Sequence, residues 1–331
     1  MSRLKKFFLL FVLLFISITI NVVLGSVLVP KGELINLLQF NFDNNSPYYH
    51  IIFDYRIPKT IVAILVGAGL GLSGLLMQSI FRNPIVGPYV LGLSSGAGLG
   101  VAVLILGSSM IGLSFISSFS ISMAAIFGSI LTLLLIMSFY VKVKNTVSLL
   151  IIGLMVGVFS GAIISILSYF TQAERLQKYV FWSMGNLGNL SWIEIGILAG
   201  ISIFAITVTV YFIKPINALL LGENYALSMG VNIKQTTTSV ILITGLLVGS
   251  TTAFVGPVAF VGLAVPHLAR MFFKTHLMQT LLPATILIGA ILMLFCDTIA
   301  QVPGSVLALP INSVTAILGA PLVIYMIFKN R

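Results

Sequence analysis

The sequence is poor in charge and in residues that could carry chemistry. Only 7% of its 331 residues are Asp, Glu, Lys or Arg, whereas soluble domains carry about 25%. This scarcity excludes a water-soluble enzyme and an intrinsically disordered chain.

Metal-binding and nucleotide-binding patterns are also missing from the sequence. Cys296 is the only cysteine, which excludes a disulfide framework and a thiolate metal cluster. His50, His267 and His276 do not have the spacing of metal ligands. There is no GxxxxGK[ST] loop, so any ATP must be hydrolysed by another chain. We therefore expect no metal, no cofactor and no catalytic site, because a membrane enzyme would need clustered acids, bases or metal ligands.

The sequence is rich in hydrophobic residues, which form long runs. Hydrophobic residues make up 59% of the chain and the mean hydropathy is +1.16, while one membrane span needs roughly 20 apolar residues. We predict an all-α polytopic membrane protein, with residues 1–331 as a single domain. Ten segments are expected near 7–28, 59–79, 89–107, 112–139, 147–170, 193–213, 236–253, 256–272, 280–299 and 311–328. The eighth should be short and broken, since it contains two glycines and two prolines.

The formal net charge of +10 is best explained by orientation in the membrane. With the N-terminus in the cytoplasm, ten spans place 12 of the 17 basic residues on the cytoplasmic side. Only one of the seven acidic residues, Glu223, falls on that side. The basic excess therefore does not indicate a nucleic-acid partner. We expect both termini on the cytoplasmic side of a bacterial cytoplasmic (inner) membrane.

No predicted span carries an acidic or basic residue near its middle. Such a residue usually marks the ion or proton path of a secondary transporter or channel, so its absence argues against that rival class. Asp297 comes nearest, and its place at the outer end of the ninth segment predicts a solvated interface residue.

Glycines recur every four residues in several of the predicted spans, a spacing that lets helices approach closely. We expect close helix packing at Gly67 and Gly71, at Gly92, Gly96 and Gly100, and at Gly153, Gly157 and Gly161.

Four sequence segments, in the order in which they occur along the chain, resemble those of one protein family. They are RIPKTIVAILVGAGLGLSGLLMQSIFRNPIVGPYVLGLSSGAGLG from Arg56, LGENYALSMGV from Leu221, GPVAFVGLAVPHLAR from Gly256 and LPINSVTAILGAP from Leu309. They are similar to the permease subunits of ATP-binding-cassette importers for ferric siderophores, haem and cobalamin (FecCD type, type II importers). The resemblance implies the type II permease fold, with ten helices per subunit, an inverted repeat and two subunits around a shared pathway.

The resemblance assigns coupling helices to about residues 217–232, which would seat in a cleft of the ATPase. The residues implied are Leu221, Gly222, Glu223, Ala226 and Gly230. Gly222, Ala226 and Gly230 recur every four residues and suggest a small-residue docking face, Gly230 suits a helix C-cap, and Glu223 suits a helix start. An ordinary amphipathic loop helix is the alternative.

At the outer face, the resemblance implies that Arg56 and Lys59 meet acidic residues of a substrate-binding protein. Snorkelling of two basic side chains to the membrane interface is the alternative. Gln301 and Ala308 stand where many relatives have Arg and Glu, which predicts a less basic docking surface.

The resemblance also places the inner gate of the pathway at Asn83 and Ile85 and at Thr146 and Val147. Turn formation and helix capping are local roles that these segments could serve instead, or as well.

Taken together, the chain is expected to be the permease of an ATP-driven importer. The implied partners are ATPase subunits, an extracytoplasmic substrate-binding protein, a second permease copy or paralogue, and membrane lipid. A ferric siderophore is the first choice of cargo, with haem second and cobalamin third; nothing in the residues selects among them.

Overall fold

The computed structural model describes residues 2–27, 29–30, 32, 46–108, 117–143, 146–302, 305 and 308–329. Ten apolar helices lie in this part of the chain and match the ten predicted segments in order. They are α1 (Arg3–Val23), α4 (Ile57–Ile80), α5 (Leu93–Ile105), α7 (Ser118–Val143), α8 (Thr146–Tyr169), α10 (Trp192–Tyr211), α13 (Ile233–Val255), α14 (Val261–Phe273), α15 (Met278–Ala300) and α16 (Ile311–Lys329). The predicted all-α polytopic fold is confirmed.

Short elements connect these helices: α3 (Pro47–His50), the π-helical η1 (Ile51–Arg56), the 3₁₀ turn η2 (Pro88–Leu91), α9 (Ala173–Ser183), α11 (Ile213–Leu221) and α12 (Glu223–Ser228). Five charged residues that contribute to the predicted charge asymmetry lie outside the described residues. They are Lys31, Glu33, Asp43, Lys144 and Arg331.

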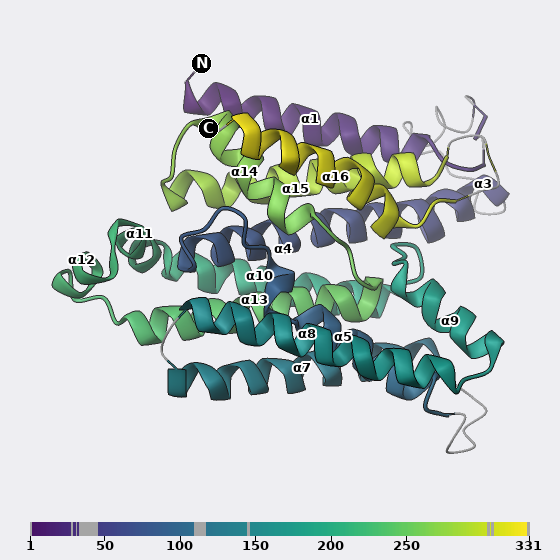
Figure 1. The fold of residues 1–331 in the computed structure, drawn as a ribbon. Coiled ribbons are helices and arrows are strands. Elements are labelled where there is room, and N and C mark those ends of the chain that lie inside the picture. Colours follow the sequence, from purple (N-terminus) through teal and green to yellow (C-terminus); the bar gives the residue numbers. More distant parts are fainter. Residues whose placement is uncertain are drawn as a thin grey trace.

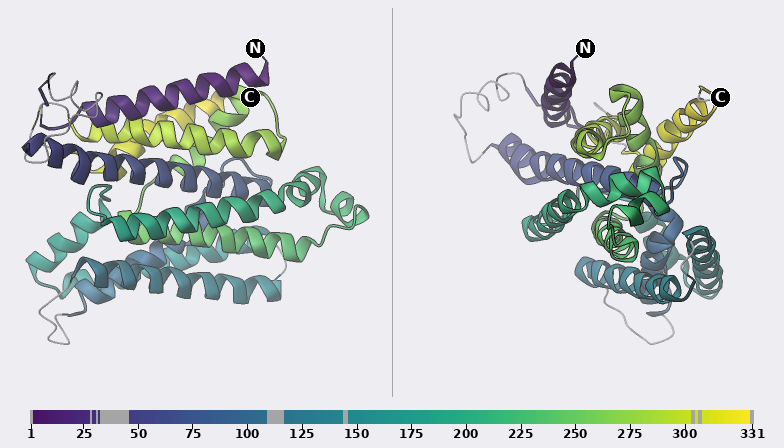
Figure 2. Two further views of the ribbon diagram at one scale, coloured as in Figure 1. Left: turned by 180° about the vertical axis from the view of Figure 1, so that it is seen from behind. Right: turned by 90° about the vertical axis from the view of Figure 1, so that its left-hand side faces the viewer.

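The helices run side by side as one bundle (Figure 1). Both ends of the described chain lie at the end that carries α11 and α12, called here the α12 end, whereas α3 and α9 lie at the opposite end, the α9 end. Viewed along the bundle, α1, α14, α15 and α16 lie on one side of α4, and α7, α8 and α13 lie on the other (Figure 2).

Helix α4 is the most buried of the long helices and packs chiefly against α15, α14 and α13. Glycines make this packing possible. A Cβ atom on Gly67 would lie 2.2 Å from the carbonyl oxygen of Gly289, and one on Gly74 would lie 1.6 Å from that of Gly262. Any side chain there would push the helices apart, because the clash is with backbone.

The predicted glycine stripes are confirmed at most positions. A Cβ on Gly96 would lie 1.9 Å from Thr132 Oγ1 in α7, and one on Gly153 would lie 2.2 Å from the carbonyl oxygen of Val90. Two glycines of the third stripe are exceptions. A Cβ on Gly157 would make only an ordinary contact of 3.4 Å with Ser95 Oγ, and nothing lies within 4 Å of the Cβ position of Gly161. The expectation of close packing at Gly161 is therefore wrong.

Two of the membrane helices, α5 and α14, have only 13 residues each. Each follows an irregular segment rich in glycine and proline, and the two segments meet inside the bundle, where the Tyr89 hydroxyl donates to the carbonyl of Val258. The eighth predicted span is thus short and broken as expected. Irregular backbone is tolerated at membrane depth because protein surrounds it and partners its polar groups.

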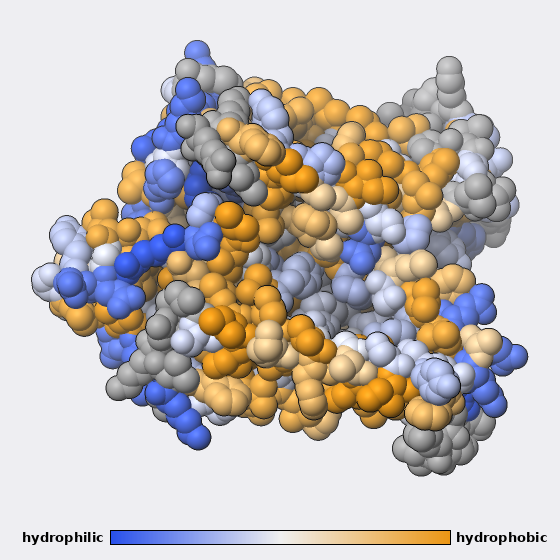
Figure 3. Space-filling view, in the orientation of Figure 1, coloured by the Kyte–Doolittle hydropathy of each residue, from blue (hydrophilic) through white to orange (hydrophobic). Residues whose placement is uncertain are grey.

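On the face shown in Figure 3, apolar residues form two broad bands between the ends of the bundle, with a more polar strip between the bands, and hydrophilic residues gather at the ends. Large hydrophobic side chains of α1, α7 and α8 are exposed, among them Phe8, Phe127 and Phe159. In water such surfaces would drive aggregation, whereas in hydrocarbon they are the expected lipid-facing or subunit-facing surface.

Candidate functional site

The α12 end carries a projecting tip formed by α11 and α12 (Figure 1). The two helices are separated by Gly222, whose backbone angles (φ 132°, ψ 150°) are accessible in practice only to glycine. Helix α12 ends in a Schellman motif: Val231 N–H donates to the Ala226 carbonyl, and Gly230 N–H donates to the Leu227 carbonyl. Gly230 adopts φ +75°, which confirms the predicted C-cap.

The predicted small-residue face of the tip is wrong. Ala226 is 0% exposed and packs inward against the core of its own chain, while Gly222 and Gly230 lie outside the six residues of α12. The side chains that project outward are large and apolar. Leu221, Tyr225, Leu227 and Met229 are 49–69% exposed.

Glu223 begins α12, as predicted, in the first turn where the helix dipole favours a carboxylate. Its Oε1 atom lies 3.8 Å from Arg82 Nη2 at the end of α4. The pair connects the tip to the membrane helices, but both side chains are partly exposed and the distance is long, so its contribution to stability is small.

The α9 end holds a buried polar network around Asp297. This residue of α15 is 1% exposed, and its Oδ1 lies 2.9 Å from Lys59 Nζ in α4. Its Oδ2 accepts hydrogen bonds from Asn21 Nδ2 (3.0 Å) and Gln301 Nε2 (2.7 Å). The prediction of a solvated Asp297 is wrong, because two neighbouring helices supply the partners that compensate its burial.

Gln301 is not part of an outward docking surface either. Its side chain is buried and reaches back by one helical turn to Asp297. Gln301 is thus a neutral donor that satisfies the buried Asp297 carboxylate from within the same helix end. Ala308, the other residue for which we predicted a less basic docking surface, lies in the segment before α16 and is exposed.

Arg56 is directed into its own chain. The residue is 6% exposed, and its guanidinium donates to the carbonyls of Val22, Val23 and Val27. These carbonyls lie at and beyond the last turn of α1, where a helix lacks internal partners and favours a cation. Arg56 therefore caps α1. Lys59, with 24% of its side chain exposed, is the more accessible of the two predicted docking residues.

The predicted gate residues lie in two segments of the α12 end. Asn83 Oδ1 accepts a hydrogen bond from the Ile85 amide (3.0 Å), which forms a local turn, and the Ile85 side chain is exposed. Thr146 and Val147 open helix α8; their side chains lie outside the described part. The structure thus confirms the turn at Asn83.

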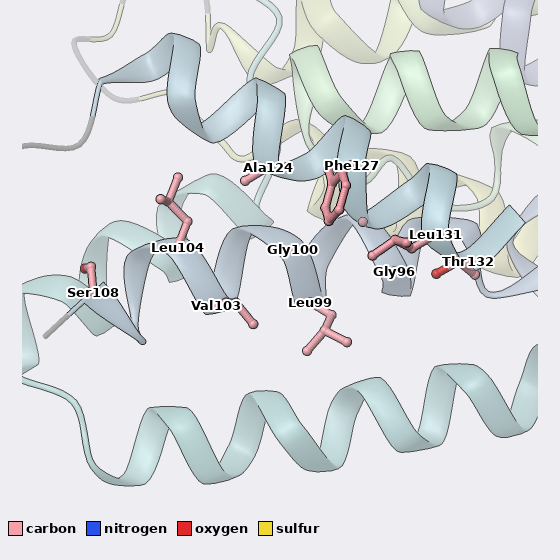
Figure 4. Close-up of a pocket in the computed structure, with 11 residues that line it drawn as sticks. Gly96, Leu99, Gly100, Val103, Leu104, Ser108, Ala124, Phe127, Leu131 and Thr132 are labelled. Carbon is pink, nitrogen blue, oxygen red and sulfur yellow. The ribbon is translucent and has the colours of Figure 1, made fainter. Parts of the chain in front are cut away.

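Two cavities accompany these sites. The larger, about 470 Å³, lies between α5 and α7 and is walled by glycines and apolar side chains such as Leu99, Val103, Phe127 and Leu131 (Figure 4). The second, about 270 Å³, is polar and lies beneath the tip. Among the described residues, no group of three or more His, Cys, Asp or Glu side chains is placed to hold a metal ion.

Several contacts could not be found from sequence patterns. Asn21 lies in an apolar run with no motif around it, and its partners in α15 are nearly 280 residues away in the chain. The sequence gives two signals of this network: the amide of Asn21 in one membrane helix and the acid Asp297 near the end of another. Polar side chains in such helices usually have partners, but the sequence does not show which ones.

A bundle of ten apolar helices in the described part of the chain, with a projecting tip, defines a polytopic α-helical membrane protein. The chain belongs to the FecCD transport family, whose profile matches residues 12–329, and it is thus a permease of the ATP-binding-cassette importers. It is 32% identical over 321 residues to the vitamin B12 import system permease protein BtuC of Klebsiella pneumoniae, covering 96% of this chain and 92% of that protein. It is also 32% identical over 303 residues to the hemin transport system permease protein HmuU of Yersinia pestis, covering 88% and 87%.

Solved structures agree with this assignment. A metal-chelate type ABC transporter in an inward-facing conformation matches with a TM-score of 0.84 and 31% identity, covering 99% of this chain and 100% of that one. PsaBC from Streptococcus pneumoniae, solved with a Fab, matches with a TM-score of 0.57 and 17% identity, covering 90% and 95%. The second likeness concerns the fold alone.

Proposed function

We propose that this chain forms the translocation pathway of an importer for a metal chelate, with a ferric siderophore as the first cargo. The observation that carries the proposal is the near full-length match to permeases named for vitamin B12 and for hemin, and to a metal-chelate type transporter. The identity to the two permeases is equal, so identity does not choose between cobalamin and haem, which stay the alternative cargoes.

The proposal includes separate ATPase subunits that contact the tip. Leu221, Gly222, Glu223, Ala226 and Gly230 shape this contact, but in different ways. Exposed apolar side chains at a polar, projecting end of a membrane protein need a protein partner to cover them. Leu221 and its exposed neighbours thus supply the contact area. Gly222, Ala226 and Gly230 set the angle and seating of α12, and Glu223 ties it to Arg82.

Orientation is part of the same proposal. The α12 end carries Arg3, Lys5 and Lys6 on α1 and Lys214 and Lys234 beside the tip. The positive-inside rule then assigns this end, with both termini, to the cytoplasm of the bacterial inner membrane. Because Cys296 is buried, a cysteine at exposed Ser228 will label with a membrane-impermeant maleimide against a low background. We expect labelling in inverted vesicles and none in intact spheroplasts; the reverse pattern refutes the orientation.

At the other end, an extracytoplasmic binding protein delivers the cargo. We propose Lys59 as the direct docking residue and Arg56 as a residue that holds the docking region in shape through α1. Alternating access then requires two permeases, identical or paralogous, around the pathway. Asn83 and Ile85, together with Thr146 and Val147, form its inner gate.

Transport in proteoliposomes tests the proposal. The chain is reconstituted with its ATPase and binding protein, and uptake of a ferric siderophore, haem and cobalamin is measured with ATP, without ATP and with a hydrolysis-deficient ATPase. We expect ATP-dependent uptake of one chelate. Uptake that persists without ATP supports an ion-coupled secondary transporter instead, and ATP-dependent uptake of haem or cobalamin alone corrects the cargo.

A further inference from the structure

The polar cavity beneath the tip brings together basic side chains from three segments. Arg82 follows α4, Arg270 lies in the last turn of α14, and His276 lies in the link to α15. Leu220 of α11 and Leu281 of α15 add apolar wall. Among the described residues, no acidic side chain lines this space of about 270 Å³, so a ligand that enters it meets positive charge.

Arg270 is held in position without being neutralised. Its Nη1 donates to Gln78 Oε1, and Gln78, which is buried, in turn donates from Nε2 to the Leu263 carbonyl (3.2 Å). Within the described part of the chain, no carboxylate lies within 4.0 Å of this guanidinium. A fixed arginine with spare donors is suited to planar or tetrahedral oxyanions.

Arg82 occupies a backbone position that normally selects glycine. It follows the C-cap of α4 with φ +47°, and Asn83 N–H closes the motif on the Gln78 carbonyl (3.2 Å). A side chain in this left-handed conformation is strained, and such strain is retained mainly where the side chain has a role. In the part of the chain that the structure describes, the carboxylate paired with Arg82 is that of Glu223, in the long, partly exposed pair already described.

The remaining polar groups of the wall favour an anion as well. Asn83 Oδ1 accepts from the Ile85 amide, so its Nδ2 group is the donor that remains. Ser79 donates its hydroxyl proton within the chain, to the Leu75 carbonyl. The cavity thus presents guanidinium and amide donors, and its main acceptor, Gln78 Oε1, is already used by Arg270.

We propose that this cavity binds a phosphate group, either of an anionic phospholipid headgroup or of a free phosphate ester. Basic pockets between membrane helices at the cytoplasmic surface attract such headgroups. A bound phosphate bridges α4 and α14 directly under α11, and so joins the segment of Asn83 to the tip. The inference goes beyond transport and uses the proposed function only for the cytoplasmic side.

Two glycine substitutions provide a matched test. Arg82→Gly removes one charge from the cavity and also relieves the left-handed backbone. Lys274→Gly removes one charge at another left-handed position (φ +52°) at the same end of the bundle, but Lys274 is exposed and does not line the cavity. Both variants should fold, because glycine suits both positions. Arg270→Gln is a second cavity variant.

The measurement is the Tm of the purified full chain in neutral detergent, with added phosphatidylglycerol, phosphatidylcholine or inorganic phosphate. We expect phosphatidylglycerol or inorganic phosphate to raise the Tm of the wild type and of Lys274→Gly by about 3 °C. Arg82→Gly and Arg270→Gln should lose most of this shift, and phosphatidylcholine should have little effect on any of them.

The comparison of the three additives distinguishes the two sources of the phosphate group. A shift with phosphatidylglycerol alone identifies the headgroup, and a shift with inorganic phosphate identifies a free ester. Equal shifts in all four proteins, or none in the wild type, overturn the proposal. If Arg82→Gly keeps the Tm shift of the wild type but binds the ATPase more weakly, the cavity accepts a carboxylate of the ATPase. That result also overturns the proposal. Transport is not needed for this readout, so its outcome is independent of the cargo.

Discussion

Lys59 in the first turn of α4 and Asp297 in the last turns of α15 form an ion pair of 2.9 Å whose carboxylate is buried. Asn21 of α1 donates to the second carboxylate oxygen, and its own Oδ1 accepts from the Thr60 hydroxyl (2.8 Å). One acidic residue thus joins three helices at the α9 end. In a membrane, an apolar side chain is about as stable against lipid as against another helix, so apolar contacts give the helices little positional preference. Polar links such as these therefore set the relative position of the helices.

Asp297→Asn should destabilise the chain because it leaves the Lys59 ammonium without a counter-charge. Breaking a buried pair costs about 3–5 kcal/mol, and since Lys59 keeps some contact with solvent we expect about 2–3 kcal/mol. Thermal unfolding in detergent measures the loss. The double variant Lys59→Met, Asp297→Asn should recover part of it. If the double variant is no more stable than the single one, the ion pair is not the source of the loss.

Gln301→Glu should also lower stability, because it places a second carboxylate beside Asp297 in a buried site. Gln301→Met, which keeps the length and adds no charge, is the control and should cost about 1–2 kcal/mol through the lost donor. We expect the Tm to fall further for Glu than for Met. Equal Tm values for the two variants contradict this interpretation.

Arg56→Glu should weaken association with the binding protein, and it should do so together with a loss of stability. The guanidinium caps the end of α1 through three carbonyls, and a carboxylate there repels them. Tm and binding-protein affinity are measured on the same samples, with Lys59→Ala as the comparison. Lower affinity in Arg56→Glu with an unchanged Tm assigns Arg56 to direct docking, whereas equal affinity to the wild type removes it from the docking site.

Leu227→Asp should lower ATP-dependent uptake at least tenfold without changing the Tm. Leu227 projects from the tip into solvent, so its replacement disturbs no internal packing, but a charge in an apolar contact with the ATPase is costly. Gly222→Trp is a poorer test, because its backbone geometry rejects any side chain. Leu277→Asp, at an exposed position of the same end beside α15, is the control and should retain uptake. Full uptake by Leu227→Asp excludes Leu227 from the ATPase contact.

Gly74→Ala should prevent correct assembly of the bundle, because its Cβ would lie 1.6 Å from the Gly262 carbonyl oxygen. Gly161→Ala, with nothing within 4 Å of the new atom, should be neutral or slightly stabilising through helix propensity, by up to about 1 kcal/mol. The yield of monodisperse protein after detergent extraction and its Tm report both effects. Similar yields for the two variants would mean that α4 and α14 can separate at no cost.

Local patterns predicted those features that depend on local physics. The ten apolar runs became ten helices, the run with paired glycines and prolines became the short α14, and Gly230 closed α12 as a C-cap. Each of these outcomes depends on residues within a few positions of one another. The order of the four family blocks predicted the family because this order can be read from the sequence without any spatial contact.

The wrong predictions concern direction and pairing. Ala226 turns inward and its large neighbours turn outward because α12 is seated on the core by Gly222 and the Schellman turn. Nothing in the spacing of small residues could reveal this. Asp297 and Gln301 were expected at the surface because an acid near a helix end is usually solvated; their burial depends on Lys59 and Asn21, far away in the chain.

Composition and the order of residues were therefore sufficient for the membrane class, the order of the apolar helices and the family, because hydrophobic length and local capping act over a few turns of helix. Only the folded bundle decided which polar side chains are satisfied internally and which are presented to partners. The energy of a buried charge depends on the groups that surround it in space, and at Asp297 those groups come from α1 and α4 as well as from its own end of α15.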